Sequence, residues 1–414
     1  MDVDNDGNHA LGKVRVLELA GELGAYTGKL FADLGAEVIR IESLDGDPTR
    51  RQKPFFRDNP GEENSLRYQY LNTNKKGMVL DITLPEGREI IRKLVQNVDI
   101  LIESNPPGYL DKLGIGYEQL RVINPKLVYT AITPYGQTGP YKDYPYSDLT
   151  VLAMGGFLYM AGIENDKPAQ APDKQSYFMG DLYAAFGSIV ALYHANITGE
   201  GQFVDISLQE SVTTALENAI QAYDLEGRIQ RASGSVEAGY GTYCCKDGYV
   251  YVMAAMGRNT HLWDPLARWL IEEKIPDAES LACAQWAEPE YRKRKESKEL
   301  FKQIFERFSR QRTKQELYEE SQKRKVVIYP VNTSKDVSKN PQLNHRKFFK
   351  AMRVEALGGT VCYPGAPYKL EKVPWELRKA APYFGEDTGL VLLESGYSKS
   401  QIKSLAERGV VYVK

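Results

Sequence analysis

The sequence predicts an α/β protein, with a parallel sheet flanked by helices and a smaller α+β domain in the same chain. Segments with strand and helix periodicity alternate from residue 13 to residue 223, a pattern typical of βαβ units. Near residue 226 the pattern changes to an antiparallel hairpin followed by long charged helices. A chain of 414 residues is long enough for two domains.

The first βαβ unit lies near the start of the chain. Residues 13–19, "KVRVLEL", predict a buried strand, residues 24–35 a helix, and residues 36–42, "AEVIRIE", a second strand. The same alternation continues, so we expect further members of one parallel sheet. These are strands at 77–82, 98–104, 126–133 and 201–208, and helices at 85–97, at 209–223 and from Asp181 onward.

The smaller domain is marked by "GTYCCKDGYVYVM", in which residues alternate on both sides of an Asp247-Gly248 turn and indicate a hairpin. Long charged helices are expected in the region that follows it. After these come a stretch rich in proline and glycine and two short helices. We expect residues 1–225 and 331–414 to form the large domain and residues 226–330 the α+β domain.

The composition disfavours several classes of protein. The 53 lysines and arginines nearly balance 55 aspartates and glutamates without a long basic block, which argues against a nucleic-acid partner. The first residues lack the basic and apolar sections of a signal peptide, and no run of about 18 apolar residues occurs. We therefore expect a cytoplasmic protein without a membrane partner. The four cysteines form neither a disulfide framework nor C-x-x-C pairs, so we expect them to be reduced.

The glycines near the first turn raise the possibility of a dinucleotide site. A dinucleotide site requires G-x-G-x-x-G, because its first two glycines make a tight turn and let the backbone reach a pyrophosphate. Gly21, Gly24 and Gly28 are instead three and four residues apart. We therefore interpret these glycines as residues that let a helix pack on the sheet, and we disfavour an oxidoreductase site.

Asp181 precedes the apolar run "LYAAFGSIVALY", which predicts a buried helix. One interpretation is an N-cap, whose loss costs about 1 kcal/mol. The other is a nucleophile: with a reference pKa of about 3.9 the carboxylate is ionised at pH 7, and a helix N-terminus favours the anion by about 0.3–1 kcal/mol. Such an enzyme needs no catalytic histidine. The four histidines form no metal pattern, and no G-x-S-x-G is present.

Five motifs, in the same order, give the chain a resemblance to a known family. They are "VLELAGELGAYTGKLFADLGAEVIRIE", "NTNKKGMVLDITLPEGREII", "LDKLGIGYEQLRVINPKLVYTAITPYGQTGPY", "TGEGQFVDISL" and "APYFGEDTGLVLLESGYSKSQIKSLAERGVV". Over nearly its whole length the chain resembles the family III CoA-transferases, named for carnitine and bile-acid CoA-transfer proteins. The resemblance implies a large Rossmann-like domain made from both chain ends, a small domain between them, and an interlocked homodimer.

The resemblance also implies a mechanism, since the family's nucleophilic aspartate falls on Asp181. The carboxylate would attack an acyl-CoA thioester to give a mixed anhydride and then an aspartyl-CoA thioester, from which an acceptor acid takes the CoA. Water must be excluded during these steps. The substrates implied are an acyl-CoA and a small carboxylic acid, with no metal and no tightly bound cofactor.

CoA carries phosphates, so cationic or backbone-donor contacts are expected. Lys112 is the strongest candidate, because it matches a CoA-contacting position of the family and keeps the positive charge. The chain departs from the family at "ESNPPG" and at Ser43, where an arginine is common, so phosphate contacts could shift to Arg40, Arg50 or Lys75. Further matches to cofactor-contact positions are Leu80, Asp81, Thr83, Ser104, Asn105, Tyr135 and Gly136. Gly257, in "AAMGRN", is expected in a loop that covers the active site.

Two alternatives remain at the level of sequence. An α-methylacyl-CoA racemase would need a second acid/base facing the aspartate, and related racemases place a histidine directly before an aspartate. Here Ser147 precedes Asp148, which disfavours that chemistry. The other alternative is a non-catalytic CoA-binding protein, against which the Gly180-Asp181 pair argues.

Overall fold

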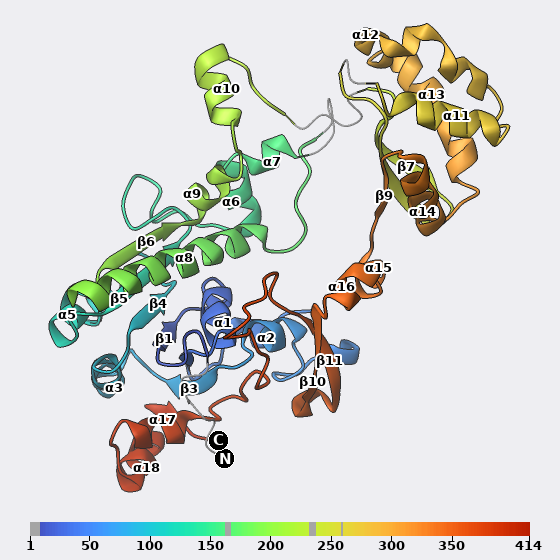
Figure 1. The fold of residues 1–414 in the computed structure, drawn as a ribbon. Helices are drawn as coiled ribbons and strands as arrows, with labels where there is room; N and C mark the ends of the chain where they lie inside the picture. Colours follow the sequence, from blue (N-terminus) through green and yellow to red (C-terminus); the bar gives the residue numbers. More distant parts are fainter. Residues whose placement is uncertain (1–8, 162–166, 232–236, 258–259) are drawn as a thin grey trace. The chain divides into compact units, whose positions relative to one another are not determined.

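The computed structural model describes residues 9–161, 167–231, 237–257 and 260–414, and these form two compact units. The larger unit contains residues 1–160, 170–230 and 345–414, and the smaller contains 161–169 and 231–344. The first and last parts of the chain thus share one unit (Figure 1). Of the helices described, none has the length and apolar character required to cross a membrane.

A seven-stranded sheet forms the centre of the larger unit, in the order β12-β3-β2-β1-β4-β5-β6. All neighbours pair in parallel except β12, which runs antiparallel to β3 and brings the end of the chain to the sheet edge. The strand order 3-2-1-4-5-6 within this sheet is that of a doubly wound fold. It confirms the predicted α/β class with a large parallel-dominated sheet. The strands are β1 (Arg15–Leu19), β2 (Glu37–Glu42), β3 (Lys76–Leu80), β4 (Ile100–Glu103), β5 (Val128–Thr133), β6 (Phe203–Ser207) and β12 (Val411–Tyr412).

Helices cover both faces of this sheet, and strands such as β4 and β5 are therefore buried along their whole length. Apolar residues of α3, α5, α17 and α18 pack on one face, and those of α1, α6, α8 and α9 on the other. The helices of the larger unit are α1 (Ala25–Asp33), α2 (Leu66–Leu71), α3 (Pro85–Val95), α4 (Tyr109–Lys112), α5 (Tyr117–Ile123), α6 (Asp148–Met154), α7 (Phe157–Met160), α8 (Gln175–Thr198), α9 (Leu208–Thr214), α10 (Ala219–Glu226), α17 (Thr388–Glu394) and α18 (Lys399–Glu407).

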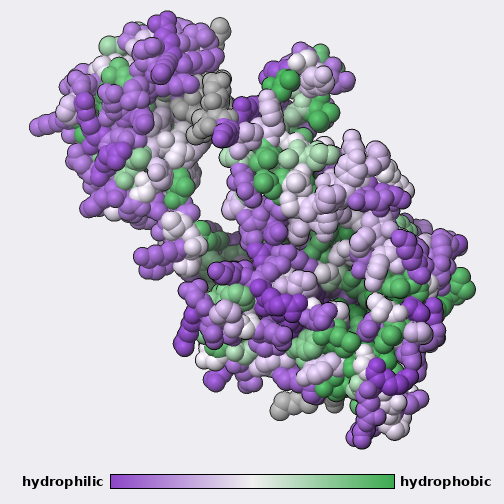
Figure 2. Space-filling view, turned by 180° about the vertical axis from the view of Figure 1, so that it is seen from behind, coloured by the Kyte–Doolittle hydropathy of each residue, from purple (hydrophilic) through white to green (hydrophobic). Residues whose placement is uncertain are grey.

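The smaller unit is built on the antiparallel sheet β7-β8-β9, and the expected hairpin across Asp247 and Gly248 is present. Its core is aromatic, with Trp263 stacked on Trp286 at 4.9 Å between ring centroids. The face of the smaller unit that Figure 2 shows is mainly hydrophilic. The elements are β7 (Tyr240–Cys245), β8 (Gly248–Met253), β9 (Ile328–Val331), α11 (Trp263–Glu272), α12 (Pro289–Arg292), α13 (Lys295–Ser309), α14 (Lys314–Arg324), α15 (Ser334–Ser338) and, at its boundary, α16 (Pro341–His345).

Several elements differ from the sequence expectations. The helix expected over 209–223 is two helices, α9 and α10, separated at Glu217, which has a positive φ of 52°. A second antiparallel hairpin, β10 (Phe349–Val354) with β11 (Gly359–Pro364), lies in a region for which no strand was expected. It packs against Leu66 and Tyr70 of α2. The hairpin therefore supports the helix on one side of the site described next.

Candidate active site

Asp181 lies inside helix α8 and does not cap it. The helix begins at Gln175, so Asp181 is its seventh residue, and the expectation of a helix starting at Asp181 was wrong. The sequence missed the first two turns because "QSYFMG" mixes polar, aromatic and glycine residues without a clear period. A Cβ at Gly180 would lie 2.1 Å from a methyl group of Leu208, so a larger residue would force the buried Leu208 side chain to move. The glycine thus lets α8 and α9 approach closely beside the carboxylate.

The Asp181 carboxylate caps a different helix, α1. Oδ1 accepts a hydrogen bond from the Gly24 backbone N–H at 2.9 Å, and Oδ2 accepts one from the Tyr26 N–H at 3.2 Å. Thr27 donates its hydroxyl to the Asp181 backbone carbonyl at 3.1 Å. The first N–H groups of a helix have no partner within the helix, and its N-terminus favours an anion. The Asp181 side chain therefore caps the neighbouring helix α1 and not its own helix α8. The same carboxylate remains the candidate nucleophile.

Burial determines the acidity of this group. Asp181 is only 1% exposed, and desolvation raises the pKa of its carboxyl from 3.8 to about 7, although the two backbone N–H groups act in the opposite direction. The expectation of a carboxylate with an ordinary pKa was therefore wrong. Near neutral pH the group is divided between its protonated and ionised forms.

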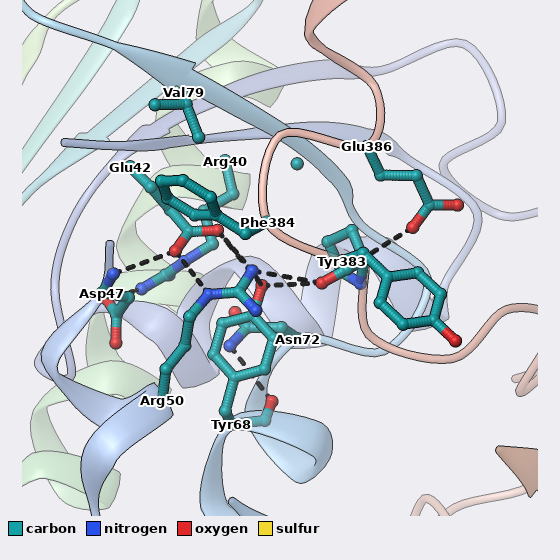
Figure 3. Close-up of polar contacts among 12 residues, drawn as sticks. Arg40, Glu42, Asp47, Arg50, Tyr68, Asn72, Val79, Tyr383, Phe384 and Glu386 are labelled. Atoms are coloured by element: carbon teal, nitrogen blue, oxygen red, sulfur yellow. Dashed lines mark hydrogen bonds and ion pairs between the residues drawn. The ribbon is translucent and has the colours of Figure 1, made fainter. Parts of the chain in front are cut away.

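A buried network of charges lies on the same side of the sheet as the first turn of α1. Arg40 forms ion pairs with Glu18 and Asp47. The Arg50 guanidinium forms two 2.7 Å hydrogen bonds to Glu42 (Figure 3). Arg50 also donates to the Pro382 carbonyl at 3.2 Å, which ties the returning C-terminal segment to this network. Burial acts to lower the pKa of Arg40, but Asp47 and Glu18 outweigh it and raise that pKa above its usual range.

The three cations to which phosphate contacts could have shifted are all part of this network. Arg40 and Lys75 are 0% exposed and Arg50 is 1% exposed. Lys75 lies 2.8 Å from Glu18 and donates to the Ala25 carbonyl of α1 at 2.7 Å, while burial lowers its pKa to about 8. Their positions do not support phosphate binding, because each would have to give up a buried ion pair with Glu18, Asp47 or Glu42.

Gly28 has the packing role expected for the glycines of the first turn, whereas a Cβ at Gly21 would meet no atom within 4 Å. A Cβ at this position would lie 1.6 Å from a carboxylate oxygen of Glu18. A larger residue would therefore displace the Glu18 carboxylate from its ion pairs or push α1 away from β1. Through Glu18 and Lys75, the network fixes the start of α1 and hence the two N–H groups that hold Asp181.

The expected CoA-contact residues lie beyond the carboxyl ends of the parallel strands, where ligands bind in open α/β sheets. Ser104 and Asn105 follow β4; the Ser104 hydroxyl accepts the Gly21 N–H at 3.1 Å, and Asn105 donates its N–H to Glu103 at 2.7 Å. Burial raises the pKa of Glu103 to about 7. Gly21 and Ser104 thus join the ends of β1 and β4, between which the strand order reverses.

Two further groups of expected residues lie at the same edge. Leu80 ends β3 with its side chain buried in the core, so only its backbone can face a ligand. Asp81 follows, and its Oδ1 accepts the Thr83 N–H and hydroxyl at 2.8 and 2.6 Å. Tyr135 and Gly136 follow β5, and Lys112 is exposed at the end of α4.

A cavity of about 210 Å³ adjoins Asp181 within the larger unit. It is smaller than the roughly 300–1,000 Å³ of pockets for drug-sized ligands, so it suits a small molecule. The pocket is mainly apolar and contains five charged residues. Its lining residues are Glu22, Tyr26, Pro54, Leu66, Arg67, Tyr70, Leu71, Asp173, Lys174, Tyr177, Phe178 and Asp181.

Sequence reasoning missed most of this wall and the two N–H donors. Backbone donors carry no side-chain signature. Arg67 and Tyr70 belong to a short helix, α2, whose place beside α1 depends on tertiary packing. The Ser147-Asp148 pair is structural: Asp148 accepts the backbone N–H and hydroxyl of Ser176 at 2.8 and 2.7 Å and so holds the start of α8.

Other expected groups are placed as follows. His194 is exposed on α8 and contacts the Glu200 carbonyl at 3.3 Å. Gly257 belongs to the smaller unit, where its N–H donates to Glu237 at 2.8 Å; residues 258–259 of its loop lie outside the described part. Among the described residues, no group of three histidine, cysteine, aspartate or glutamate side chains could hold a metal ion.

Comparison with known proteins supports an enzyme of the CoA-transferase type. The chain is 46% identical to "Succinyl-CoA:(R)-benzylsuccinate CoA-transferase subunit BbsE" of Thauera aromatica, covering 97% of this chain and 98% of that protein. It is 32% identical to "Succinate--glutarate CoA-transferase" of Agrobacterium fabrum, covering 93% and 95%. A crystal structure of a CAIB/BAIF family protein from Brucella suis aligns with a TM-score of 0.80 at 26% identity, covering 92% of this chain and 98% of that one.

The family model for "CoA-transferase family III" matches residues 11–388, which include the smaller unit, most of the larger unit and Asp181. The relatives agree with this match over nearly the whole chain. The chain therefore belongs to CoA-transferase family III.

Proposed function

We propose that this enzyme transfers CoA from an acyl-CoA to a carboxylic acid with Asp181 as the nucleophile. The observation that carries the proposal is the position of Asp181: a buried carboxylate at the start of α1, bordering a small, mainly apolar cavity at the carboxyl edge of the sheet. A thioester is activated enough for an ionised carboxylate to attack its carbonyl. The surrounding apolar side chains restrict water, which would hydrolyse an anhydride.

The proposed reaction has four steps. An Asp181 oxygen attacks the thioester carbonyl, the C–S bond breaks, and CoA leaves as a thiolate, giving a mixed anhydride. The thiolate attacks the Asp181 carbonyl and releases the donor acid, leaving an aspartyl-CoA thioester. The acceptor carboxylate attacks this thioester to form a second anhydride and free thiolate. The thiolate then attacks the acceptor's acyl carbon, releasing the new acyl-CoA and the Asp181 carboxylate.

The Gly24 and Tyr26 N–H groups have a second role in this scheme. They hold the two carboxylate oxygens at 2.9 and 3.2 Å in the resting state. A thiolate attacks the Asp181 carbonyl of the first anhydride, and the acceptor carboxylate attacks the same carbonyl in the aspartyl-CoA thioester. In both steps negative charge develops on that carbonyl oxygen. A fixed N–H donor at the end of a helix stabilises such an oxyanion without reorganisation.

We propose that CoA lies along the carboxyl edge of the sheet. Ser104, Asn105 and the Tyr135-Gly136 turn border the crevice, and Lys112 supplies an exposed charge for a phosphate. Asp81 and Thr83 extend this edge to β3. Arg40 is not included because it is buried in ion pairs.

The substrates are proposed from relatives. The names of several of them combine succinyl-CoA with dicarboxylic acids such as glutarate and malate. We propose succinyl-CoA as the donor and a dicarboxylic acid as the acceptor. Incubating the enzyme with succinyl-CoA and a panel of free acids, and measuring each new acyl-CoA by mass, tests this directly. The proposal fails if no acid accepts CoA.

The racemase alternative is separated by a second measurement. A racemase would exchange the proton beside the thioester carbonyl with solvent, without any acceptor acid. In D₂O, we expect an α-methylacyl-CoA to gain no deuterium at this position. Deuterium incorporation that depends on Asp181 would contradict the transfer mechanism.

The transfer rate should rise as pH increases through neutrality. With the pKa of Asp181 raised to about 7, roughly one tenth of the group is ionised at pH 6 and roughly nine tenths at pH 8. Because the ionised form is the nucleophile, kcat/KM is expected to increase about tenfold over this range and level off above it. A profile that is flat from pH 5 to pH 9 would indicate an ordinary, fully ionised carboxylate.

We also propose that the enzyme assembles as a homodimer through the outer face of α8. This face is apolar yet exposed, contrary to the buried helix expected from the sequence: Phe186 is 69% exposed and Tyr193 70% exposed. Exposed apolar patches of this kind mark interfaces. The face consists of Leu182, Phe186, Ile189, Val190, Tyr193 and Ile197.

Placing glutamate on this face should convert the dimer to a monomer. We expect Phe186→Glu with Tyr193→Glu to halve the mass measured by light scattering, since two charges would be buried without partners. Val122→Glu, at an exposed apolar position of α5, is the matched control and should remain a dimer. A wild-type chain that is monomeric when purified alone would contradict the proposed homodimer.

A further inference from the structure

The cavity beside Asp181 contains a cation that the proposed mechanism does not use. Arg67, on α2, lines the same cavity as Asp181. Its guanidinium donates to Glu22 at 2.9 Å and also pairs with Asp173. The Arg67 side chain is 15% exposed, so it is largely enclosed and still accessible from the cavity.

We infer that this pocket receives the acceptor acid and that Arg67 binds a second carboxylate on it, selecting dicarboxylic acids with an apolar or aromatic substituent. The inference rests on the proposed function, because it places the reacting carboxylate at Asp181. An acid that reaches Asp181 with one carboxylate could reach the pocket wall with the other.

The two partners of Arg67 differ in a way that permits exchange. The Asp173 side chain is 55% exposed, and exposed ion pairs contribute only about 0–1 kcal/mol. A substrate carboxylate can therefore replace Asp173 at little cost. Glu22 is 15% exposed and also accepts a hydrogen bond from Gln52 at 3.2 Å, so it remains and orients the guanidinium. A planar guanidinium suits this task because it binds two carboxylates with separate N–H groups.

The rest of the wall determines the body of the acid. Tyr26 contacts Phe178 edge-to-face at 4.7 Å and faces Tyr70 at 6.4 Å between ring centroids. With Leu66 and Tyr177, these side chains form an apolar and aromatic surface in the cavity that Asp181 and Arg67 also line. Aromatic rings favour offset or edge-to-face contacts, so a phenyl substituent fits this surface better than a hydroxyl does.

The test compares acids that differ by one carboxylate. 2-Benzylsuccinate and 4-phenylbutanoate form one pair, and succinate and propanoate the other. In the wild type we expect the diacid of each pair to be preferred. In Arg67→Met, kcat/KM for the diacids should fall about 10–100-fold, mainly through KM, while that for the monoacids should stay the same. Arg67→Lys should restore part of the diacid preference.

Arg121→Met is the matched control, because Arg121 also pairs with a glutamate, Glu118, but lies on α5 outside the pocket. It should leave both classes of acid unaffected. If Arg67 only stabilised the fold, Arg67→Met would lower kcat/KM for diacids and monoacids equally, and that outcome would overturn the inference. So would a wild type without diacid preference.

A separate measurement distinguishes failure of this inference from failure of the proposed function. Wild type and Arg67→Met are incubated with butyryl-CoA, which has no second carboxylate, and with hydroxylamine. We expect a hydroxamate on Asp181 in both proteins, detected by mass analysis. If neither protein is labelled, the nucleophile is wrong. If both are labelled but Arg67→Met keeps the diacid preference, only the role of Arg67 is wrong.

Discussion

Asp181→Asn should lower CoA transfer at least about a thousandfold while the protein stays folded. Asparagine has nearly the same shape, and its single carbonyl oxygen can still accept one of the two N–H groups that Gly24 and Tyr26 offer. It cannot form an anhydride or an aspartyl-CoA thioester, so the covalent route is closed. Steady-state transfer from succinyl-CoA to an accepted acid provides the measurement.

Asp99→Asn is the matched control for this variant. Asp99 also accepts a backbone N–H, from Arg15 at 2.8 Å, but it precedes β4 at the opposite edge of the sheet. The CoA-transfer activity of Asp99→Asn should equal that of the wild type. Circular dichroism and the unfolding midpoint verify that both variants fold. Full activity in either Asp181→Asn or Asp181→Ala would exclude Asp181 as the nucleophile.

Trapping experiments locate the covalent intermediate. Borohydride added during turnover should reduce the thioester at Asp181 to an alcohol, and hydroxylamine should convert it to a hydroxamate. Peptide mass analysis then assigns the modified residue. Both adducts should be absent from Asp181→Asn and present in Asp99→Asn.

Arg40→Met should produce the largest loss of stability among the substitutions considered. Arg40 is completely buried and pairs with both Glu18 and Asp47. Removing it leaves Asp47 without a cation and Glu18 with Lys75 as its remaining partner, and breaking a buried ion pair in this way costs about 3–5 kcal/mol. Equilibrium denaturation in urea, followed by a probe of the larger unit, measures the change.

The same variant decides between structure and phosphate binding for Arg40. If Arg40 is structural, the molecules that remain folded should bind acyl-CoA with an unchanged KM. Arg121→Met, at an exposed ion pair, should change the unfolding free energy by less than about 1 kcal/mol. Unchanged stability combined with a higher KM for acyl-CoA would return Arg40 to the CoA site.

Much of the larger unit could be predicted from sequence. The strands from β1 to β5 are short runs rich in apolar residues and buried along nearly all their length, a pattern that parallel strands show regardless of their neighbours. Helix α8 was harder, because its start at Gln175 depends on Asp148, which accepts the Ser176 N–H from 28 residues away in the chain. A local pattern does not record such a partner.

Motif order along the chain was enough to determine the family and to single out Asp181, because these are properties of the sequence itself. Only the tertiary structure decided what that carboxylate is like. Its pKa depends on desolvation and on N–H groups of α1, which is about 155 residues away in the chain. The same holds for Arg40, whose charge suggests a phosphate contact but which the structure buries in ion pairs with Glu18 and Asp47. Charge is written in the sequence, but exposure and pairing arise from packing between distant segments.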